Sequence, residues 1–173
     1  MPAHLRHADP TRPIGAVARV YATLAATRFA KFISRHINWK IDPFLLRLTG
    51  GRFATTLFFP TALLESRGAK SGTQRRNAII YFHDGDRVTI AASNAGGSRH
   101  PAWYHNLLVH PEVTFGGIPM RATEVTDDAE RERLWVLADR VFPAFTRYRR
   151  DAAEVNRTIP IIQLICRDPS AAQ

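Results

Sequence analysis

The feature that most limits how this chain can fold is a run of short strand-like segments separated by tight turns. Residues 77–83 and 87–93 are both rich in branched or aromatic residues, and Asp84-Gly85-Asp86 stands between them. Aspartate-glycine pairs are typical of tight hairpin turns, because glycine adopts a positive φ without a steric penalty. The two segments are therefore predicted to pair as antiparallel neighbours.

The same kind of pattern extends from residue 61 to residue 165. Strands are expected over residues 61–65, 77–83, 87–93, 113–115, 118–125 and 159–165. Helices are expected over residues 101–108, 127–141 and 144–154, and Phe142-Pro143 separates the last two. The pattern predicts an α+β fold, a small barrel of about six mostly antiparallel strands with flanking helices.

The two ends of the chain differ in composition from its middle. Residues 1–12 and residues 169–173 are expected to be flexible. Residues 13–40 are expected to form a basic amphipathic helix. Its stretch 14–37 either packs on the core of the domain or lies on an anionic membrane surface. The domain itself is expected to cover residues 41–168.

Composition points to one domain in a reducing compartment. With 173 residues, 45% of them hydrophobic, the chain can bury a core without disulfides or a metal. Cys166 is the single cysteine and borders an apolar run, so it is expected to serve as a small core residue. No stretch reaches the ~20 apolar residues of a membrane span, and the N-terminus lacks the pattern of a secretory signal. A cytoplasmic location is expected.

Signatures of hydrolytic and metal-dependent chemistry are missing from the sequence. It contains no nucleophile elbow, no HExxH motif, no P-loop and no GxGxxG after a strand. His100, His105 and His110 recur every five residues, a spacing that puts them on different sides of a helix. No metal site is therefore expected.

The positive charge is concentrated in the first half of the chain and peaks in one turn. The chain carries a formal charge of +9, and residues 1–83 contain thirteen Lys and Arg against three acidic residues. Cations, hydroxyls and glycines gather in one turn, which contains Arg67, Gly68, Lys70, Ser71, Gly72, Thr73, Arg75 and Arg76. Exposed backbone N–H groups, hydroxyls and arginine forks all bind phosphate or carboxylate, so this basic turn (residues 67–76) is predicted to bind an anion. It contains no aromatic residue, which argues against nucleic acid as the partner.

A second cluster follows the strand over residues 87–93. Small residues occupy most of positions 91–97, and residues 101–107 read Pro-Ala-Trp-Tyr-His-Asn-Leu. Accessible backbone beside a helix start suits a flat ring, although Trp103 and Tyr104 fit equally well as core anchors. Together, the two clusters predict a planar anionic ligand.

Taken in order, these motifs resemble the deazaflavin-dependent nitroreductase family, the actinobacterial enzymes that use coenzyme F420. The resemblance covers about residues 45 to 166 and is carried by LLESRGAKSG at 63–72, Arg75-Arg76-Asn77, DGDRV at 84–88, Ala92-Ser93, PAWYHNL at 101–107, His110-Pro111, Val113, Phe142-Pro143 and RTIP at 157–160. No single motif would suffice, but their order and spacing make the resemblance specific.

The resemblance implies a split β-barrel, F420 as the hydride carrier, and a conjugated acceptor such as a quinone, a nitro-aromatic or an enone. The hydride chemistry would belong to the cofactor, while the protein supplies binding, position and charge. The implied cofactor-binding residues are Arg67, Lys70, Ser71, Arg75, Arg76, Asn77, Ala92, Ser93, Asn94, Ala95, Gly96, Pro101, Trp103 and Asn106.

Catalytic and acceptor-binding roles are assigned to four further candidates and to Ser93. Ser93 is the candidate to hydrogen-bond the ring or the acceptor, and Tyr148 is the candidate proton donor. The candidate pocket residues are Tyr81, Phe142, Phe145 and Tyr148. Two phenyl rings stand where nitroreductase relatives have tyrosines, so nitro-aromatic reduction does not follow from the resemblance. Asn94-Ala95-Gly96 also replaces the Lys-Gly-Gly of many relatives, which removes one cation.

Two other functions remain open at this level. One is a non-catalytic split-barrel protein that binds F420, a flavin or haem, with FMN as the runner-up cofactor. The other is a peripheral membrane module held by residues 14–37. The expected partner is a small-molecule acceptor, and a homodimer formed through the exposed sheet is compatible with the fold.

Overall fold

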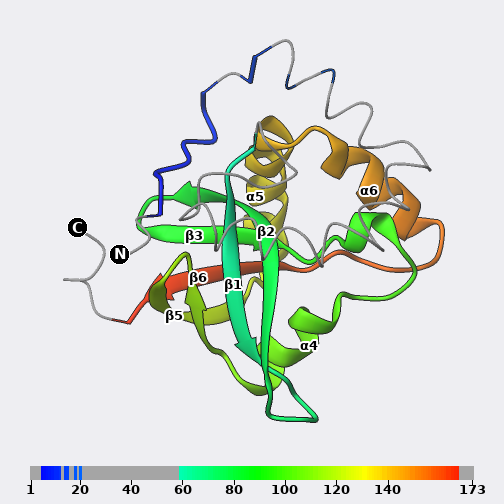
Figure 1. Cartoon of the computed structure of the whole chain (residues 1–173). Helices are drawn as coiled ribbons and strands as arrows, with labels where there is room; N and C mark the ends of the chain where they lie inside the picture. Colours follow the sequence, from blue (N-terminus) through cyan, green and yellow to red (C-terminus); the bar gives the residue numbers. More distant parts are fainter. Residues whose placement is uncertain (1–4, 13, 16–17, 19, 21–58, 168–173) are drawn as a thin grey trace.

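The strands close into one barrel in which neighbouring strands are antiparallel, in the order β1-β2-β3-β6-β5-β4 (Figure 1). The computed structural model describes residues 5–12, 14–15, 18, 20 and 59–167. The strands are β1 (Thr61–Arg67), β2 (Gln74–Asp84), β3 (Arg87–Ala91), β4 (Glu112–Phe115), β5 (Ile118–Glu124) and β6 (Ile161–Cys166). The predicted fold class, a split β-barrel of about six mostly antiparallel strands with flanking helices, is confirmed.

Three α-helices and a short 3-10 turn of the described segment flank this barrel. They are η2 (Asn94–Gly96), α4 (Ala102–Val109), α5 (Asp128–Val141) and α6 (Ala144–Ala153). Asp127 caps α5, because its Oδ1 accepts a hydrogen bond from the Glu130 backbone N at 2.8 Å. Figure 1 shows α5 and α6 together at one end of the barrel and α4 at the other end, beside the loop between β1 and β2.

Hairpin turns set the register of the sheet. Asp84 pairs with Arg87 across the β2–β3 turn, and Gly85 has a φ of 60° there. The β1–β2 pairing ends with Arg67 opposite Gln74, so the basic turn is the loop of this hairpin. Closure depends on three pairings between segments that no hairpin joins: β1 with β4, β3 with β6 and β5 with β6.

Buried side chains form two clusters on opposite faces of the barrel wall. The first fills the barrel and includes Leu64, Tyr81, Ile90, Phe115, Ile162 and Leu164. The second lies between the wall and the helices and includes Phe82, Leu134, Trp135, Phe142, Phe145, Tyr148 and Ile161. Neighbours such as Tyr81 and Phe82 belong to different clusters, because successive side chains of a strand point to opposite faces.

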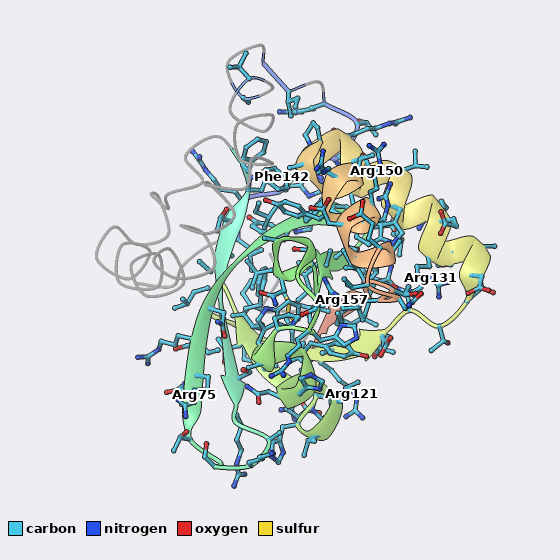
Figure 2. The ribbon with its side chains drawn as sticks, turned by 90° about the vertical axis from the view of Figure 1, so that its right-hand side faces the viewer. Arg75, Arg121, Arg131, Phe142, Arg150 and Arg157 are labelled. Carbon is cyan, nitrogen blue, oxygen red and sulfur yellow. The ribbon has the colours of Figure 1, made fainter. Side chains whose placement is uncertain are left out.

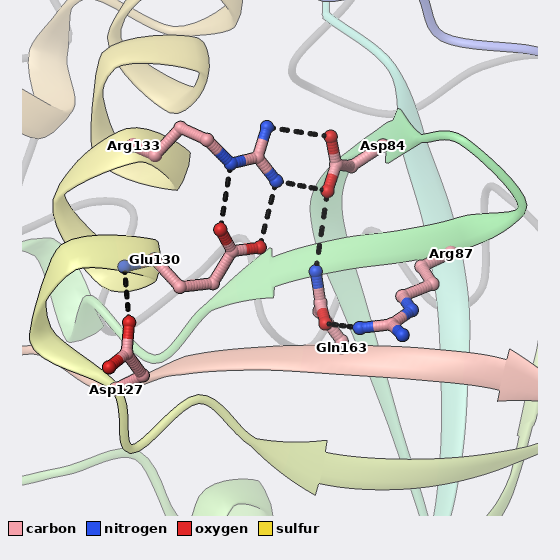
Figure 3. A network of polar contacts seen from close by, with 6 residues as sticks. All are labelled: Asp84, Arg87, Asp127, Glu130, Arg133 and Gln163. Carbon is pink, nitrogen blue, oxygen red and sulfur yellow. Dashed lines mark hydrogen bonds and ion pairs between the residues drawn. The ribbon is translucent and has the colours of Figure 1, made fainter.

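A polar network joins α5 to the β2–β3 turn (Figure 3). The Arg133 guanidinium donates to both carboxylate oxygens of Asp84, at 3.0 and 2.5 Å, and to both of Glu130, at 2.7 and 2.8 Å. Gln163 of β6 donates to Asp84 at 3.5 Å and accepts from Arg87 at 2.8 Å. The network fixes the orientation of α5 and lies away from the basic turn.

The described part of the N-terminal segment contacts the barrel. Residues 5–8, which we call the N-terminal strap, exchange two hydrogen bonds with β2: Ala8 N donates to His83 Nδ1 at 3.0 Å, and His83 N donates to Ala8 O at 2.8 Å. Arg6 O accepts a third, from the Tyr81 hydroxyl at 2.8 Å. The strap thus lies along the end of β2 that extends beyond the pairing with β1. The flexibility expected for residues 1–12 stays a prediction.

The helix expected over residues 13–40 falls almost wholly outside the described residues, as do residues 41–58 and 169–173. Within the described part of the chain, no helix combines the length and the hydropathy that a membrane crossing needs.

Candidate functional site

The basic turn is a tight loop closed by its own backbone. Gly68 N donates to Thr73 O, and Gly72 N donates to Gly68 O, each at 2.8 Å. Gly72 has a φ of 65°, a conformation that favours glycine. The Ser71 and Thr73 hydroxyls are 2.7 Å apart. These bonds hold hydroxyls and cations together at one exposed tip.

Asn106 of α4 anchors this turn to the body of the protein. Its Oδ1 accepts from Ala69 N at 2.9 Å, and its Nδ2 donates to Ser66 Oγ at 3.3 Å. Both Asn106 and Ser66 are buried. The amide of Asn106, a candidate cofactor-binding residue, is thus used to position the turn in this structure.

The cations of the turn differ in how far their charge is already compensated. Arg76 Nε lies 2.6 Å from Glu65 Oε1 on the adjacent strand, so part of its charge is neutralised. The guanidinium of Arg67 folds back toward Gly72. Lys70 and Arg75 are exposed and have no ion-pair partner among the described residues. Lys70 and Arg75 are therefore the cations most available to an incoming anion (Figure 2 shows Arg75 on this hairpin).

A second element of the site is the loop of residues 92–97, which follows β3. Ser93 has helical angles (φ −69°, ψ −39°), and the next three residues, Asn94, Ala95 and Gly96, have φ values of 46°, 49° and 73°. Such a right-handed to left-handed succession turns backbone N–H groups into one concavity that binds anions or electron-rich oxygens. The N–H groups of Asn94 and Ala95 have no acceptor among the residues that the structure describes. We call this loop the backbone nest.

Glycine is required at one position of the nest because α6 lies against it. A Cβ atom at Gly96 would stand 2.9 Å from Tyr148 O and 3.0 Å from Asp151 Cβ. Both of these atoms belong to the middle and later part of α6, so that part of the helix packs against the nest. The aromatic residues of α6 are thereby brought next to the loop.

The Arg157 side chain donates hydrogen bonds to two carbonyl oxygens of the nest. Its Nη1 donates to Ala92 O at 3.2 Å and its Nη2 donates to Ser93 O at 2.6 Å, while His100 Nδ1 lies 3.3 Å from Nη1. Arg157 is only 8% exposed. Burial and the charge of Arg157 lower the pKa of His100. The sequence motif RTIP marked this position as part of the resemblance but did not show what its arginine does, because its contacts are 64 and 65 residues away in the chain.

The helix-start residues have mainly structural contacts. Pro101 precedes α4 and accepts a hydrogen bond from Tyr104 N at 3.1 Å. Trp103 is buried in the barrel interior, which is the core-anchor alternative that the sequence left open. Tyr104 also belongs to that cluster, and its hydroxyl donates to Glu124 Oε2 at 2.8 Å.

Three of the four candidate pocket residues are brought together, and the fourth is not. The ring centroid of Phe142 lies 5.1 Å from that of Phe145 and 6.0 Å from that of Tyr148. Tyr81 belongs to the barrel interior instead, with its ring 5.4 Å from Phe115. Burial raises its pKa to about 12. The alternation of β2 turns Tyr81 to the other face of the wall, away from the other three candidates.

The closed antiparallel barrel, with its basic turn and backbone nest, has the architecture of the split-barrel oxidoreductases. The family model described as F420H(2)-dependent quinone reductase matches residues 41–165, and the chain belongs to this family. Its members depend on reduced coenzyme F420, so the expected family, the oxidoreductase class and the F420 cofactor are confirmed.

Individual relatives agree with this assignment. An F420H(2)-dependent quinone reductase of Mycobacterium tuberculosis is 30% identical over 145 residues, which cover 78% of this chain and 96% of the relative. A solved F420-H2 dependent reductase (FDR-A) is 29% identical, with a TM-score of 0.53 over 61% of this chain and 93% of its own. A structure described as a domain-swapped dimer is 25% identical, with a TM-score of 0.54 over 72% and 96% of the two chains.

Proposed function

We propose that this chain binds reduced F420 between the basic turn and the backbone nest and uses it to reduce a quinone. When bound, F420 supplies a hydride; the quinone takes up this hydride and one proton and becomes a hydroquinone. The observation that carries the proposal is that both binding elements lie inside the segment matched by the family model. The donor set also fits the group: exposed cations suit a phosphate and a carboxylate tail, and unpaired N–H groups suit a polar ring edge.

The basic turn would hold the phosphate and the glutamate tail of the cofactor. Lys70, Ser71 and Arg75 are the proposed direct contacts, since they are exposed at the tip of the hairpin. Arg67, Arg76 and Asn77 lie on the flanking strands and would extend the positive surface along the tail. The ion pair of Arg76 with Glu65 makes its contribution smaller than that of Arg75.

The backbone nest would hold the ring. Asn94 and Ala95 present N–H donors, while Ala92, Ser93 and Gly96 provide close backbone approach at the end of β3. Donors fixed in advance by the fold stabilise charge on a ring oxygen without reorganising. Because these donors belong to the backbone, the loss of the lysine that many relatives carry at this position leaves a binding element in place.

An aromatic corner at the junction of α5 and α6 (Phe142, Phe145 and Tyr148) would bind the acceptor. The three rings are buried together, and Tyr148 lies next to the nest. Two phenyl rings favour an apolar quinone over a nitro-aromatic acceptor. Tyr148 or solvent is the proposed proton source, and Ser93 the proposed hydrogen-bond partner of the ring or the acceptor.

The test is a comparison of cofactors and acceptors with the purified protein. F420 binding is followed by fluorescence, with FMN as the competing candidate, and F420H2 oxidation is measured with menadione, a nitro-aromatic and an unsaturated lactone. We expect F420 to bind, FMN to bind weakly and menadione to be the best acceptor. Tight FMN binding without F420 binding would instead support the non-catalytic flavin-binding alternative.

Two further proposals concern assembly and location. We propose a homodimer, supported by the solved relative described as a domain-swapped dimer, and light scattering of the eluted protein measures its mass.

We also propose a cytoplasmic protein whose residues 14–37 touch the membrane surface, because quinones reside in membranes and this segment is basic. Removing residues 1–37 should abolish sedimentation with anionic vesicles; if both forms stay in the supernatant, the segment does not bind membrane.

A further inference from the structure

We propose that Arg157 is a positioning residue of the hydride-transfer site, which acts on the bound cofactor through the backbone nest. This inference rests on the proposed function, because it assumes that the nest receives the deazaflavin ring. Nothing in the sequence motifs or in the similarity to relatives assigns a role to this side chain.

The first support is that one guanidinium donates hydrogen bonds to the carbonyl oxygens of two consecutive residues. Nη1 reaches Ala92 O at 3.2 Å and Nη2 reaches Ser93 O at 2.6 Å. Hydrogen bonds to a charged donor are stronger than neutral ones, and this pair lies in a buried environment. Arg157 thus fixes the orientation of two successive peptide groups at the point where β3 ends.

The orientation of these peptide groups sets the direction of the nest donors. In a trans peptide, the carbonyl and the following N–H point in opposite directions within one plane. Because Ser93 O points to the guanidinium, the N–H of Asn94 points away from it, into the concavity. The positive charge behind the carbonyl also polarises the same peptide, which strengthens Asn94 N–H as a donor.

The second support is the way in which Arg157 itself is held. Its backbone N donates to Ala152 O at 2.9 Å, and the preceding Asn156 has a φ of 54°, so the residue is fixed at the end of α6. Three residues later, Pro160 O accepts from Ala92 N at 2.9 Å. The segment before β6 therefore runs beside the nest, and the guanidinium cannot move without disturbing both.

Lysine cannot reproduce this arrangement. The guanidinium offers two N–H groups in one rigid plane, whereas an ammonium is a single point on a flexible stem. The position is also confined by His100, whose Nδ1 lies 3.3 Å from Nη1. We therefore expect Arg157→Lys to retain the fold and to lose part of the nest geometry.

The test uses Arg157→Lys and Arg157→Met in the full-length protein, with Arg149→Met as the matched control. Arg149 is another partly buried arginine, but it pairs with Asp139 and lies over the Trp135 ring, between α5 and α6. Thermal melts establish folding, F420 titration gives the Kd, and F420H2 oxidation with menadione separates kcat from KM. We expect Arg157→Lys and Arg157→Met to lower kcat at least tenfold and to shift the spectrum of bound F420, with Arg149→Met changing neither.

A double-mutant cycle separates positioning from a loss of general stability. Gly96→Ala deforms the same nest by pressing on α6, so its effect on the F420 Kd should not add to that of Arg157→Lys. Lys70→Ala acts on the distant turn, and its effect should add. If Arg157→Met does not fold, Arg157→Lys carries the test.

The outcomes separate the two proposals. Wild-type protein that neither binds F420 nor oxidises F420H2 would overturn the proposed function. Wild-type activity together with folded Arg157→Lys protein of unchanged kcat, Kd and cofactor spectrum would overturn the role of Arg157 alone. Full additivity with Gly96→Ala would also overturn it, since it would show that the two residues do not act on one loop.

Discussion

At the scale of single residues, the site depends on buried polar side chains whose partners are backbone groups. Asn106 is the clearest case, because one amide satisfies both the basic turn and a buried serine. The Arg157 guanidinium likewise donates to two carbonyl oxygens of the backbone nest. Neither side chain is proposed to touch the cofactor. A substitution at either position therefore tests whether the orientation of the backbone affects binding.

Asn106→Leu should destabilise the protein and weaken F420 binding together. The substitution leaves Ala69 N–H and the buried Ser66 hydroxyl without their partner, at a cost of about 1–3 kcal/mol in the free energy of unfolding. Asn106→Asp is the comparison variant: it keeps an acceptor for Ala69 N–H and replaces the donor to Ser66 with a second, charged carboxylate oxygen. Urea unfolding and F420 titration check both effects. Equal losses in the two variants would show that the bond to Ala69 is not the important one.

The two basic-turn cations that lack partners should dominate cofactor binding. The Lys70→Ala/Arg75→Ala double variant should raise the Kd of F420 at least tenfold, because both side chains are exposed at the hairpin tip. The control is Arg121→Ala/Arg131→Ala, which removes the same charge but from side chains paired with Glu112 and Asp128. Both proteins should melt within a few degrees of wild type. A Kd that rises equally far in the control would assign the effect to net charge rather than to the turn.

Protonation of His83 should release part of the stability contributed by the N-terminal strap. Burial lowers the pKa of His83, and the neighbouring His7 lowers it further. The unfolded state therefore takes up this proton first as the pH falls below the ordinary value of about 6.5. The stabilisation is fully present above that pH and is lost as the pH falls through the lowered pKa of the folded state, where Nδ1 becomes a donor and can no longer accept from Ala8 N.

The measurement is the urea midpoint at pH 7.5 and at pH 5.5, in wild type and in His83→Asn. Asparagine offers an acceptor that does not titrate in this range, so the variant should lose less stability on acidification. His100, whose pKa is also lowered, contributes with the same sign to both proteins and cancels in the comparison. An identical loss in wild type and variant would exclude His83 as the titrating group.

At the scale of elements, the helices are fixed to the barrel at few polar points. Arg133 joins α5 to the β2–β3 turn through Asp84 and also pairs with Glu130 (Figure 3). Its side chain is 48% exposed, so solvent screens these pairs. Arg133→Met should therefore cost roughly 1 kcal/mol of unfolding free energy, and less in 1 M salt. Urea melts at two salt concentrations test this, with Arg121→Met as a control expected to cost less because its pair is more exposed.

The elements themselves could be predicted from the sequence, whereas their long-range contacts could not. The Asp84-Gly85-Asp86 turn and the apolar alternation define the β2–β3 hairpin locally, and the structure places it there. The pairings of β1 with β4, of β3 with β6 and of β5 with β6 close the barrel between segments far apart in sequence, and no local pattern encodes them. The same limit decides which site residues the sequence reveals. The basic turn is contiguous in sequence and could be predicted, whereas the contact of Arg157 with the nest forms only on folding. Tyr81 lies apart from the other candidate pocket residues because the phase of β2 turns its side chain into the barrel.

At the scale of the whole molecule, charge and apolar surface are divided between the two proposed ligands. The formal charge of +9 comes mainly from the part of the chain before β3, which contains the basic turn, while the helices around the aromatic corner have nearly balanced charges. Such a field attracts an anionic cofactor and has no preference for a neutral quinone. Binding of the two ligands should therefore respond differently to ionic strength.

Raising the salt concentration should weaken use of the cofactor and leave use of the acceptor nearly unchanged. Between 50 and 500 mM NaCl the Debye length falls from about 14 Å to about 4 Å, so exposed cations such as Lys70 and Arg75 lose most of their longer-range attraction. We expect kcat/KM for F420H2 to fall severalfold and the KM for menadione to stay within twofold. In Lys70→Ala/Arg75→Ala the dependence on salt should be flatter, because fewer of its contacts are electrostatic. Parallel salt curves in wild type and variant would place the anionic part of the cofactor elsewhere on the positive surface.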